Sequence, residues 1–63
     1  MRLIDRYKKA LQAAPKDRYT RDGWVQLVGM SKRQWRHLKD GGHFVPTGHL
    51  QGGVVMYRFV ATP

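Results

Sequence analysis

The chain has 63 residues, enough for one small domain, and its 12 Lys and Arg against 4 Asp and Glu give a net charge of +8. It contains no cysteine, which excludes disulfides and thiolate metal sites. No apolar run approaches the roughly 20 residues of a membrane span, and the charged N-terminal residues do not resemble a signal peptide. We therefore expect one domain over residues 1–63, away from membranes, with a polyanion as its partner.

The first predicted element is an amphipathic helix over residues 2–14. Its apolar side chains recur at helical spacing and form one face: Leu3, Ile4, Tyr7, Leu11 and Ala14. Pro15 should end it, because the residue before proline avoids helical dihedrals. Residues 16–19 are interpreted as a short connection.

A second helix is predicted over residues 21–28. Thr20 can cap its first turn, and Trp24, Leu27 and Val28 recur at the spacing of one buried face. Gly29 should end this helix in a left-handed conformation.

The third helix has the clearest start signal. Ser31 is a predicted N-cap, Gln34 completes a capping box three residues later, and Met30 and Trp35 have the spacing of a hydrophobic staple. Gly41 and Gly42 mark the expected end.

After Gly42 the pattern changes to extended chain. Residues 43–45 form a short extended stretch, residues 47–53 are a predicted glycine-rich loop, and residues 54–60 are a β-branched and aromatic strand. The two extended pieces should pair as a hairpin.

Two short helices joined by Gly29, Met30 and Ser31 resemble the helix-turn-helix of repressor-like proteins over residues 21–40. With the hairpin that follows, the order of elements resembles a winged helix-turn-helix domain. The resemblance implies a mainly α fold with a small β-hairpin: a three-helix core, with its helix-turn-helix at about 20–41, plus a C-terminal wing at about 43–60. The size is similar to that of small phage or plasmid regulators and excisionases.

The third helix carries the candidate DNA contacts. If Trp35 and Leu38 point inward, the helical period of 100° per residue turns Arg33 and Arg36 outward. Such helices present their N-terminal half to base edges, so we assign Arg33 and Arg36 to bases. The remaining candidates are phosphate contacts, flanking positions or loop residues: Lys32, Gln34, His37, Lys39 and His49. The alternative left open is that every one of these residues binds phosphates without sequence preference.

Sequence-biased binding of double-stranded DNA is therefore the expected function, for a small transcriptional regulator or an architectural or recombination factor beside the nucleoid in the cytoplasm. No enzyme activity, cofactor or metal site is expected, because no acids form a plausible dyad and the three histidines lack ligand spacing. The alternative class is a protein–protein interaction module, such as a small inhibitor or adaptor. It draws on the apolar outer face of the last strand (Val54, Met56 and Val60), whose edge is expected to be open for self-association or a partner.

Overall fold

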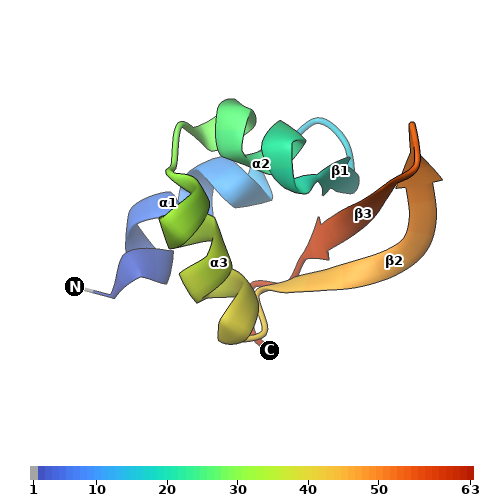
Figure 1. Ribbon diagram of the computed structural model, residues 1–63. Coiled ribbons are helices and arrows are strands. Elements are labelled where there is room, and N and C mark those ends of the chain that lie inside the picture. The colour runs from blue at the N-terminus through green and yellow to red at the C-terminus, as the bar shows by residue number, and fades with distance from the viewer. Residues whose placement is uncertain (1) are drawn as a thin grey trace.

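The computed structural model describes residues 2–63, and over this range the chain forms three helices and three strands (Figure 1). In chain order they are α1 (Leu3–Gln12), β1 (Arg18–Thr20), α2 (Arg21–Val28), α3 (Lys32–Asp40), β2 (Phe44–Gln51) and β3 (Val54–Phe59). Within the described residues, no helix has both the length and the apolar character that crossing a bilayer requires.

Helix α1 buries Ile4 and Leu11 and ends at Gln12, two residues before the predicted end. The N–H of Ala13 still donates to the carbonyl of Lys9 at 3.1 Å, so the last turn closes there. Pro15 restricts Ala14 to non-helical dihedrals, and the helix has already opened one residue earlier.

The predicted caps of α2 and α3 are confirmed. The Thr20 hydroxyl accepts a hydrogen bond from the Gly23 N–H at 3.2 Å, and Gly29 ends α2 at φ 72°. At α3 the Ser31 hydroxyl accepts from the Gln34 N–H at 3.1 Å, and the Gln34 Oε1 accepts from the Ser31 N–H at 2.9 Å. These bonds satisfy backbone donors that a helix start otherwise leaves free.

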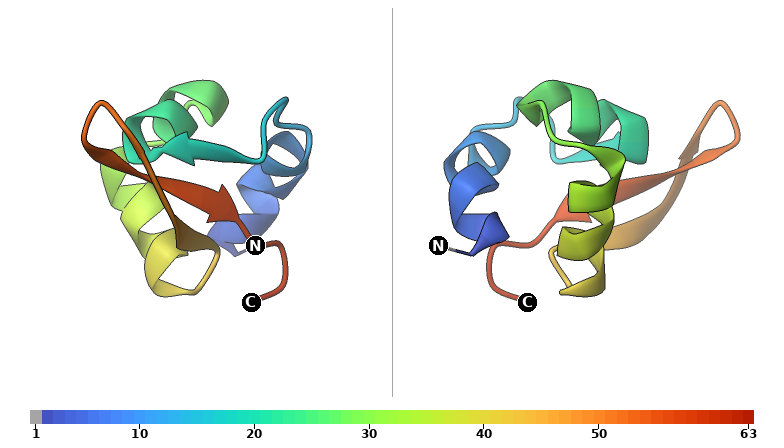
Figure 2. Two further views of the ribbon diagram at one scale, coloured as in Figure 1. Left: turned by 90° about the vertical axis from the view of Figure 1, so that its right-hand side faces the viewer. Right: turned by 60° about the vertical axis from the view of Figure 1, so that its left-hand side comes forward.

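The strands form one antiparallel sheet in the order β1-β3-β2, and this overturns the expected mainly α fold with a C-terminal wing. Helices hold 44% of the described residues and strands 27%. The sheet is not an appendage of a helical core, because its inner face packs on the helices. In the left view of Figure 2 the strands lie in front and the helices behind them.

Strand β1 is the element that sequence reasoning missed. It lies where a connection was predicted, and it pairs with β3 through Tyr19↔Tyr57 and its two neighbouring pairs. Three residues are too few to show an alternating pattern, so only tertiary pairing makes this segment a strand.

The predicted glycine-rich loop is also wrong in extent, because β2 continues to Gln51. The hairpin register is irregular between Pro46 and Leu50, where Gly48 has φ 82°. Only Gly52 and Gly53, at φ 57° and 80°, form the turn. Positive φ at both central residues is the requirement of a type I′ hairpin turn, which the diglycine meets. The resulting hairpin extends beyond the helices (Figure 1).

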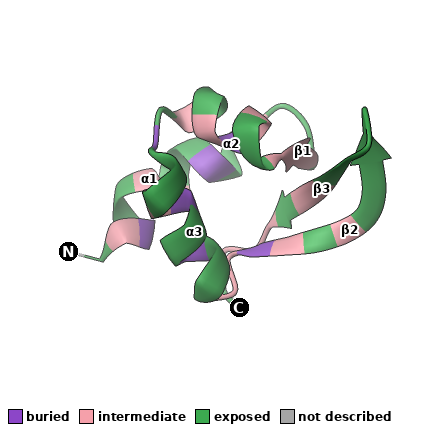
Figure 3. Cartoon of the chain, viewed as in Figure 1, coloured by how far each residue is buried: buried purple, intermediate pink, exposed green. Residues whose placement is uncertain are grey.

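The core lies between the helices and the inner face of the sheet. Over residues 2–63 its seven buried apolar side chains are Ile4, Leu11, Trp24, Met30, Trp35, Leu38 and Phe44. Phe44 joins the layers, because its ring lies 5.4 Å from both Trp24 and Trp35, centroid to centroid. In Figure 3 the buried segments accordingly lie on the facing sides of the helices and at the start of β2. Aromatic side chains from both layers thus fix α3 against the sheet.

Candidate nucleic-acid interface

Helix α3 has the rotation predicted from its sequence. Trp35 and Leu38 are buried at 4% and 2% exposure. The outward side carries the exposed residues Lys32, Arg33, Arg36, His37 and Lys39. Because the helix is capped at its start and packed through Trp35, its basic face is held on a rigid support.

The basic side chains of α3 share a surface hollow with a residue that the sequence analysis did not select, Arg21. The hollow has a volume of about 480 Å³ and is lined by Arg21, Lys32, Arg33, Trp35, Arg36 and Lys39. We call these five cations the α3 basic cluster. Arg21 begins α2 directly after the Thr20 cap. Only the packing of α2 against α3 brings it to the cluster, and no sequence pattern gives that placement.

Most of this positive charge has no acidic partner. Among residues 2–63 the ion pairs within 4 Å are Arg2 with Asp5 at 3.7 Å and Arg21 with Asp22 at 3.2 Å. Arg21 is therefore partly compensated, and the four cations on α3 are not. The uncompensated charge faces solvent and gives this side of α3 a positive electrostatic potential.

The start of α3 is electrostatically unfavourable for the isolated chain. Lys32 and Arg33 occupy the first turn, which contains no acidic residue. The helix macrodipole places partial positive charge at this end, so two cations here oppose helix formation. A phosphate bound at this end would reduce the repulsion of Lys32 and of Arg33 by the positive end of the helix macrodipole. Helix N-termini bind anions through the field of this macrodipole.

Lys39 lies at the other end of the cluster, above the aromatic core. Its Nζ is 5.7 Å from the Trp35 ring centroid and 6.0 Å from that of Tyr57. Cation–π contacts of this kind contribute about 0.5–1 kcal/mol at exposed sites. The ammonium group therefore has a preferred position beside the hollow and remains accessible to a phosphate.

Gln34 has a structural role in addition to its predicted place beside the interface. Its Oε1 accepts hydrogen bonds from the Ser31 N–H at 2.9 Å and from the Tyr7 hydroxyl at 3.0 Å. The side chain thus joins the α3 cap to α1, and its oxygen is occupied. We leave Gln34 out of the α3 basic cluster for this reason.

The histidines are dispersed. His37 is exposed on α3, whereas His49 lies on the hairpin, where its Nδ1 and its N–H are each 3.1 Å from the Thr47 hydroxyl. His43 Nδ1 is 2.8 Å from the Val60 carbonyl oxygen, which ties the end of the chain to the start of β2. Within residues 2–63 no three His, Cys, Asp or Glu side chains gather into a possible metal site. His49 does not line the hollow at α3.

The expected open edge of the last strand is wrong, because β3 is the central strand and pairs with β1 on one side and β2 on the other. Val54 is 54% exposed, while Met56 and Val60 are half-buried. Among residues 2–63, Leu50 is the most exposed large apolar side chain, at 63%, and it lies opposite Val55 in the hairpin. A partner surface at Val54, Met56 and Val60 stays a prediction, without the strand pairing first expected for it.

Comparison with protein-family models, with curated proteins and with solved structures finds no match for this chain. The evidence for an interface is therefore its own geometry, in which four exposed cations of α3 and Arg21 of α2 surround a hollow above a buried indole.

Proposed function

We propose that this chain is a double-stranded DNA-binding domain that lays the exposed face of α3 in the major groove, acting as a small transcriptional regulator or an architectural or recombination factor beside the nucleoid. The observation that carries the proposal is the α3 basic cluster on a capped and rigid helix. In this role the chain binds without catalysis and requires no cofactor. The helix-turn-helix resemblance over residues 21–40 supports the same assignment.

The dimensions of α3 suit a groove. An α-helix with its side chains is about 10–12 Å across, and the major groove of B-DNA is about 12 Å wide and admits one helix. Arg33 and Arg36 lie three residues apart and therefore neighbour each other on one helical face. Each can form a bidentate pair with guanine, which discriminates by roughly 1–3 kcal/mol against the wrong base.

The remaining cations suit the DNA backbone. Lys32 at the start of α3 and Lys39 near its end flank the two arginines along the helix, and Arg21 at the start of α2 lines the same hollow. Contacts to phosphate outnumber contacts to bases in most complexes and set the register of the helix on the duplex. We therefore assign Arg21, Lys32 and Lys39 to phosphates, with His37 beside them.

A protein–protein interaction module is the second candidate function, and one observation favours it. The hairpin exposes Leu50 and Val54 by more than half of their surface, and Val55 by 39%. Leu50 and Val55 are register partners and share one face of the projecting hairpin, and contiguous exposed apolar side chains are typical of docking surfaces. Such a module would retain its partner when the α3 cations are replaced, which separates it from a DNA-binding domain.

Selection from a random duplex pool at physiological salt tests the proposed function. Sequence-biased binding predicts an enriched site of a few base pairs, and Arg33→Ala and Arg36→Ala should each relax preference at one or two positions of that site. A bound pool without enrichment would reduce both arginines to phosphate contacts. A pool that is not retained at all would remove the DNA-binding proposal and leave the protein-docking candidate.

A further inference from the structure

Two arginines face each other across the strands on the outer face of the sheet. Arg18 of β1 is the direct register partner of Arg58 of β3. Side chains at paired positions point to the same face of a sheet, and the neighbouring pair Tyr19↔Tyr57 points the opposite way, toward the helices. The arginines therefore share the face that turns away from the core.

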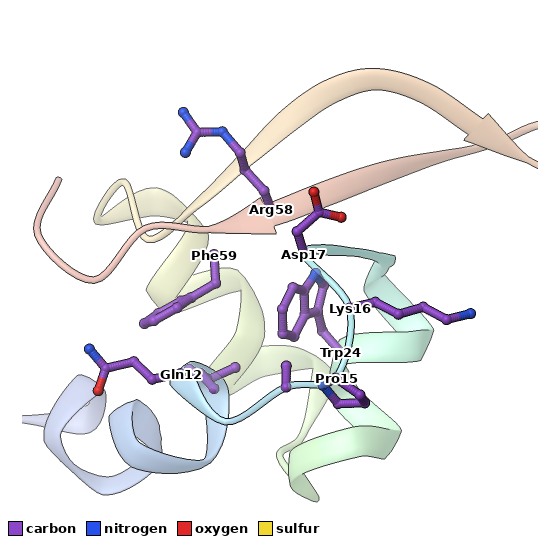
Figure 4. Close-up of a pocket in the computed structure, with 9 residues that line it drawn as sticks. Gln12, Pro15, Lys16, Asp17, Trp24, Arg58 and Phe59 are labelled. Atoms are coloured by element: carbon purple, nitrogen blue, oxygen red, sulfur yellow. The ribbon is translucent and has the colours of Figure 1, made fainter.

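This pairing is unfavourable for the chain alone. Like charges directly opposite each other destabilise a strand pair, whereas opposite charges stabilise it. Neither arginine is in an ion pair among residues 2–63, although Asp17 directly precedes Arg18. Figure 4 shows the Arg58 guanidinium and the Asp17 carboxylate pointing apart. The local charge is thus left free for an external anion.

Lys16 extends the arginine pair into a basic surface. It lines one hollow with Asp17 and Arg58 and a second hollow with Arg18 and Thr20. We call Lys16, Arg18 and Arg58 the sheet basic site. Two carboxylates line these hollows, Asp17 and Asp22, and Asp22 is paired with Arg21 at 3.2 Å. The three cations therefore leave the site positive, and hollows on either side admit the oxygens of a phosphodiester chain.

The sheet basic site and the α3 basic cluster lie on different sides of the domain. Helix α3 packs through Trp35 onto the inner face of the sheet, where the ring centroids of Trp35 and Tyr57 are 4.9 Å apart. The exposed side of α3 therefore turns away from the sheet, and the arginine pair turns away from α3. The domain measures only 35 × 20 × 19 Å. Duplex DNA has a persistence length of about 150 base pairs, so one straight segment does not wrap around a body this small.

We propose that the sheet basic site binds the phosphate backbone of a second duplex segment, so that one copy of the chain bridges two duplexes. The proposal rests on the proposed function for its first duplex, held by α3. It explains the like-charge pair between the edge strand β1 and the central strand β3. It also gives the site a ligand class, the phosphodiester backbone, with no sequence preference required.

A capture assay with two duplexes tests the bridging. One duplex is immobilised on beads, the second carries a fluorophore, and the chain is added below saturation of the immobilised duplex. The unmodified chain should retain the fluorescent duplex, while Arg58→Gln and Arg18→Gln should each reduce its retention by about tenfold as phosphate contacts are lost. Arg6→Gln is the matched control, because it removes the same charge from an exposed position on α1. Arg58→Lys, which keeps the charge, should retain most of the capture.

Two further measurements, of single-duplex affinity and of Tm, separate the role of the sheet basic site from the role of α3. Affinity for a single free duplex should change less than about twofold in Arg58→Gln, since α3 is intact, and fall in Arg33→Gln/Arg36→Gln. The Tm of Arg58→Gln should rise by about one to a few degrees as the like-charge repulsion is removed, while that of Arg58→Lys should not.

Retention of the second duplex by Arg58→Gln at the level of the unmodified chain would overturn the proposal. It would point instead to bridging by self-association, which loss of the outer-face arginines does not weaken. Failure of the unmodified chain to capture any second duplex would overturn it as well. Capture that requires Arg58 while single-duplex affinity ignores Arg33 and Arg36 would support the sheet site and contradict the assigned role of α3.

Discussion

The indole Nε1 of Trp24 donates a 2.8 Å hydrogen bond to the main-chain carbonyl oxygen of Tyr57. This bond joins the middle of α2 to the central strand, and the Tyr57 ring in turn meets Trp35 of α3 edge-on at 4.9 Å. One residue of β3 therefore contacts both tryptophans. The position of α3, and with it the α3 basic cluster, depends on this arrangement.

The two tryptophans should differ in how much stability depends on their N–H groups. Trp35 Nε1 is buried without a hydrogen-bond partner, whereas Trp24 Nε1 is bonded to Tyr57. Replacement by phenylalanine removes a similar volume at both sites, but only Trp24→Phe also removes a hydrogen bond. We expect Trp24→Phe to lower the free energy of unfolding by about 1–2 kcal/mol more than Trp35→Phe does. Urea denaturation followed by circular dichroism measures the difference, and equal losses would show that the bond contributes nothing.

The cap of α3 provides a second matched pair of variants, Ser31→Ala and Gln34→Ala. Ser31→Ala loses one bond, to the Gln34 N–H, and should cost about 1 kcal/mol of unfolding free energy. Gln34→Ala loses the acceptor of both the Ser31 N–H and the Tyr7 hydroxyl, and should cost at least about 1 kcal/mol. Duplex affinity, measured well below the Tm, should be unchanged in Gln34→Ala. A loss of affinity in a fully folded Gln34→Ala would return Gln34 to the interface.

Lys39 should contribute to DNA binding through its charge alone, without reading bases. Lys39→Ala is expected to weaken binding to specific and random duplexes alike and to reduce the slope of log affinity against log salt by about one. Its cation–π contacts with Trp35 and Tyr57 predict an added loss of unfolding free energy of about 0.5–1 kcal/mol. Fluorescence anisotropy over a salt series measures the slope, and selective loss on the preferred site would show that Lys39 reads bases.

Local signals in the sequence were sufficient for the helices. The caps at Thr20 and Ser31, the left-handed Gly29 and the buried stripe of Trp35 and Leu38 all follow from short-range chemistry, and the structure contains each of them. Such features depend on neighbours within about four residues. The outward side of α3 could therefore be predicted as well.

The sheet could not be predicted in the same way. β1 exists because Tyr19 pairs with Tyr57, a partner 38 positions away in the chain, and a three-residue segment shows no period of its own. Because β1 was not predicted, β3 was expected to have an open edge, and the pairing of Arg18 with Arg58 was not foreseen. Arg21 was missed for the same reason, because its place beside α3 is decided by the packing of α2. These errors concern contacts between segments that are separated in sequence, whereas the extent of β2 was misjudged within a single hairpin.

The most direct test of the central claim compares two double variants that remove equal charge. Arg33→Gln/Arg36→Gln removes two cations from α3, and Arg6→Gln/Lys9→Gln removes two exposed cations from α1. Duplex affinity is titrated by anisotropy over a salt series for both variants and for the unmodified chain, with folding checked by circular dichroism. A DNA-binding α3 predicts that the α3 variant loses at least about tenfold in affinity and flattens the salt slope by about two, while the α1 variant stays near the unmodified chain. Equal losses in the two variants, or an unmodified chain that does not bind duplex DNA, would contradict the account.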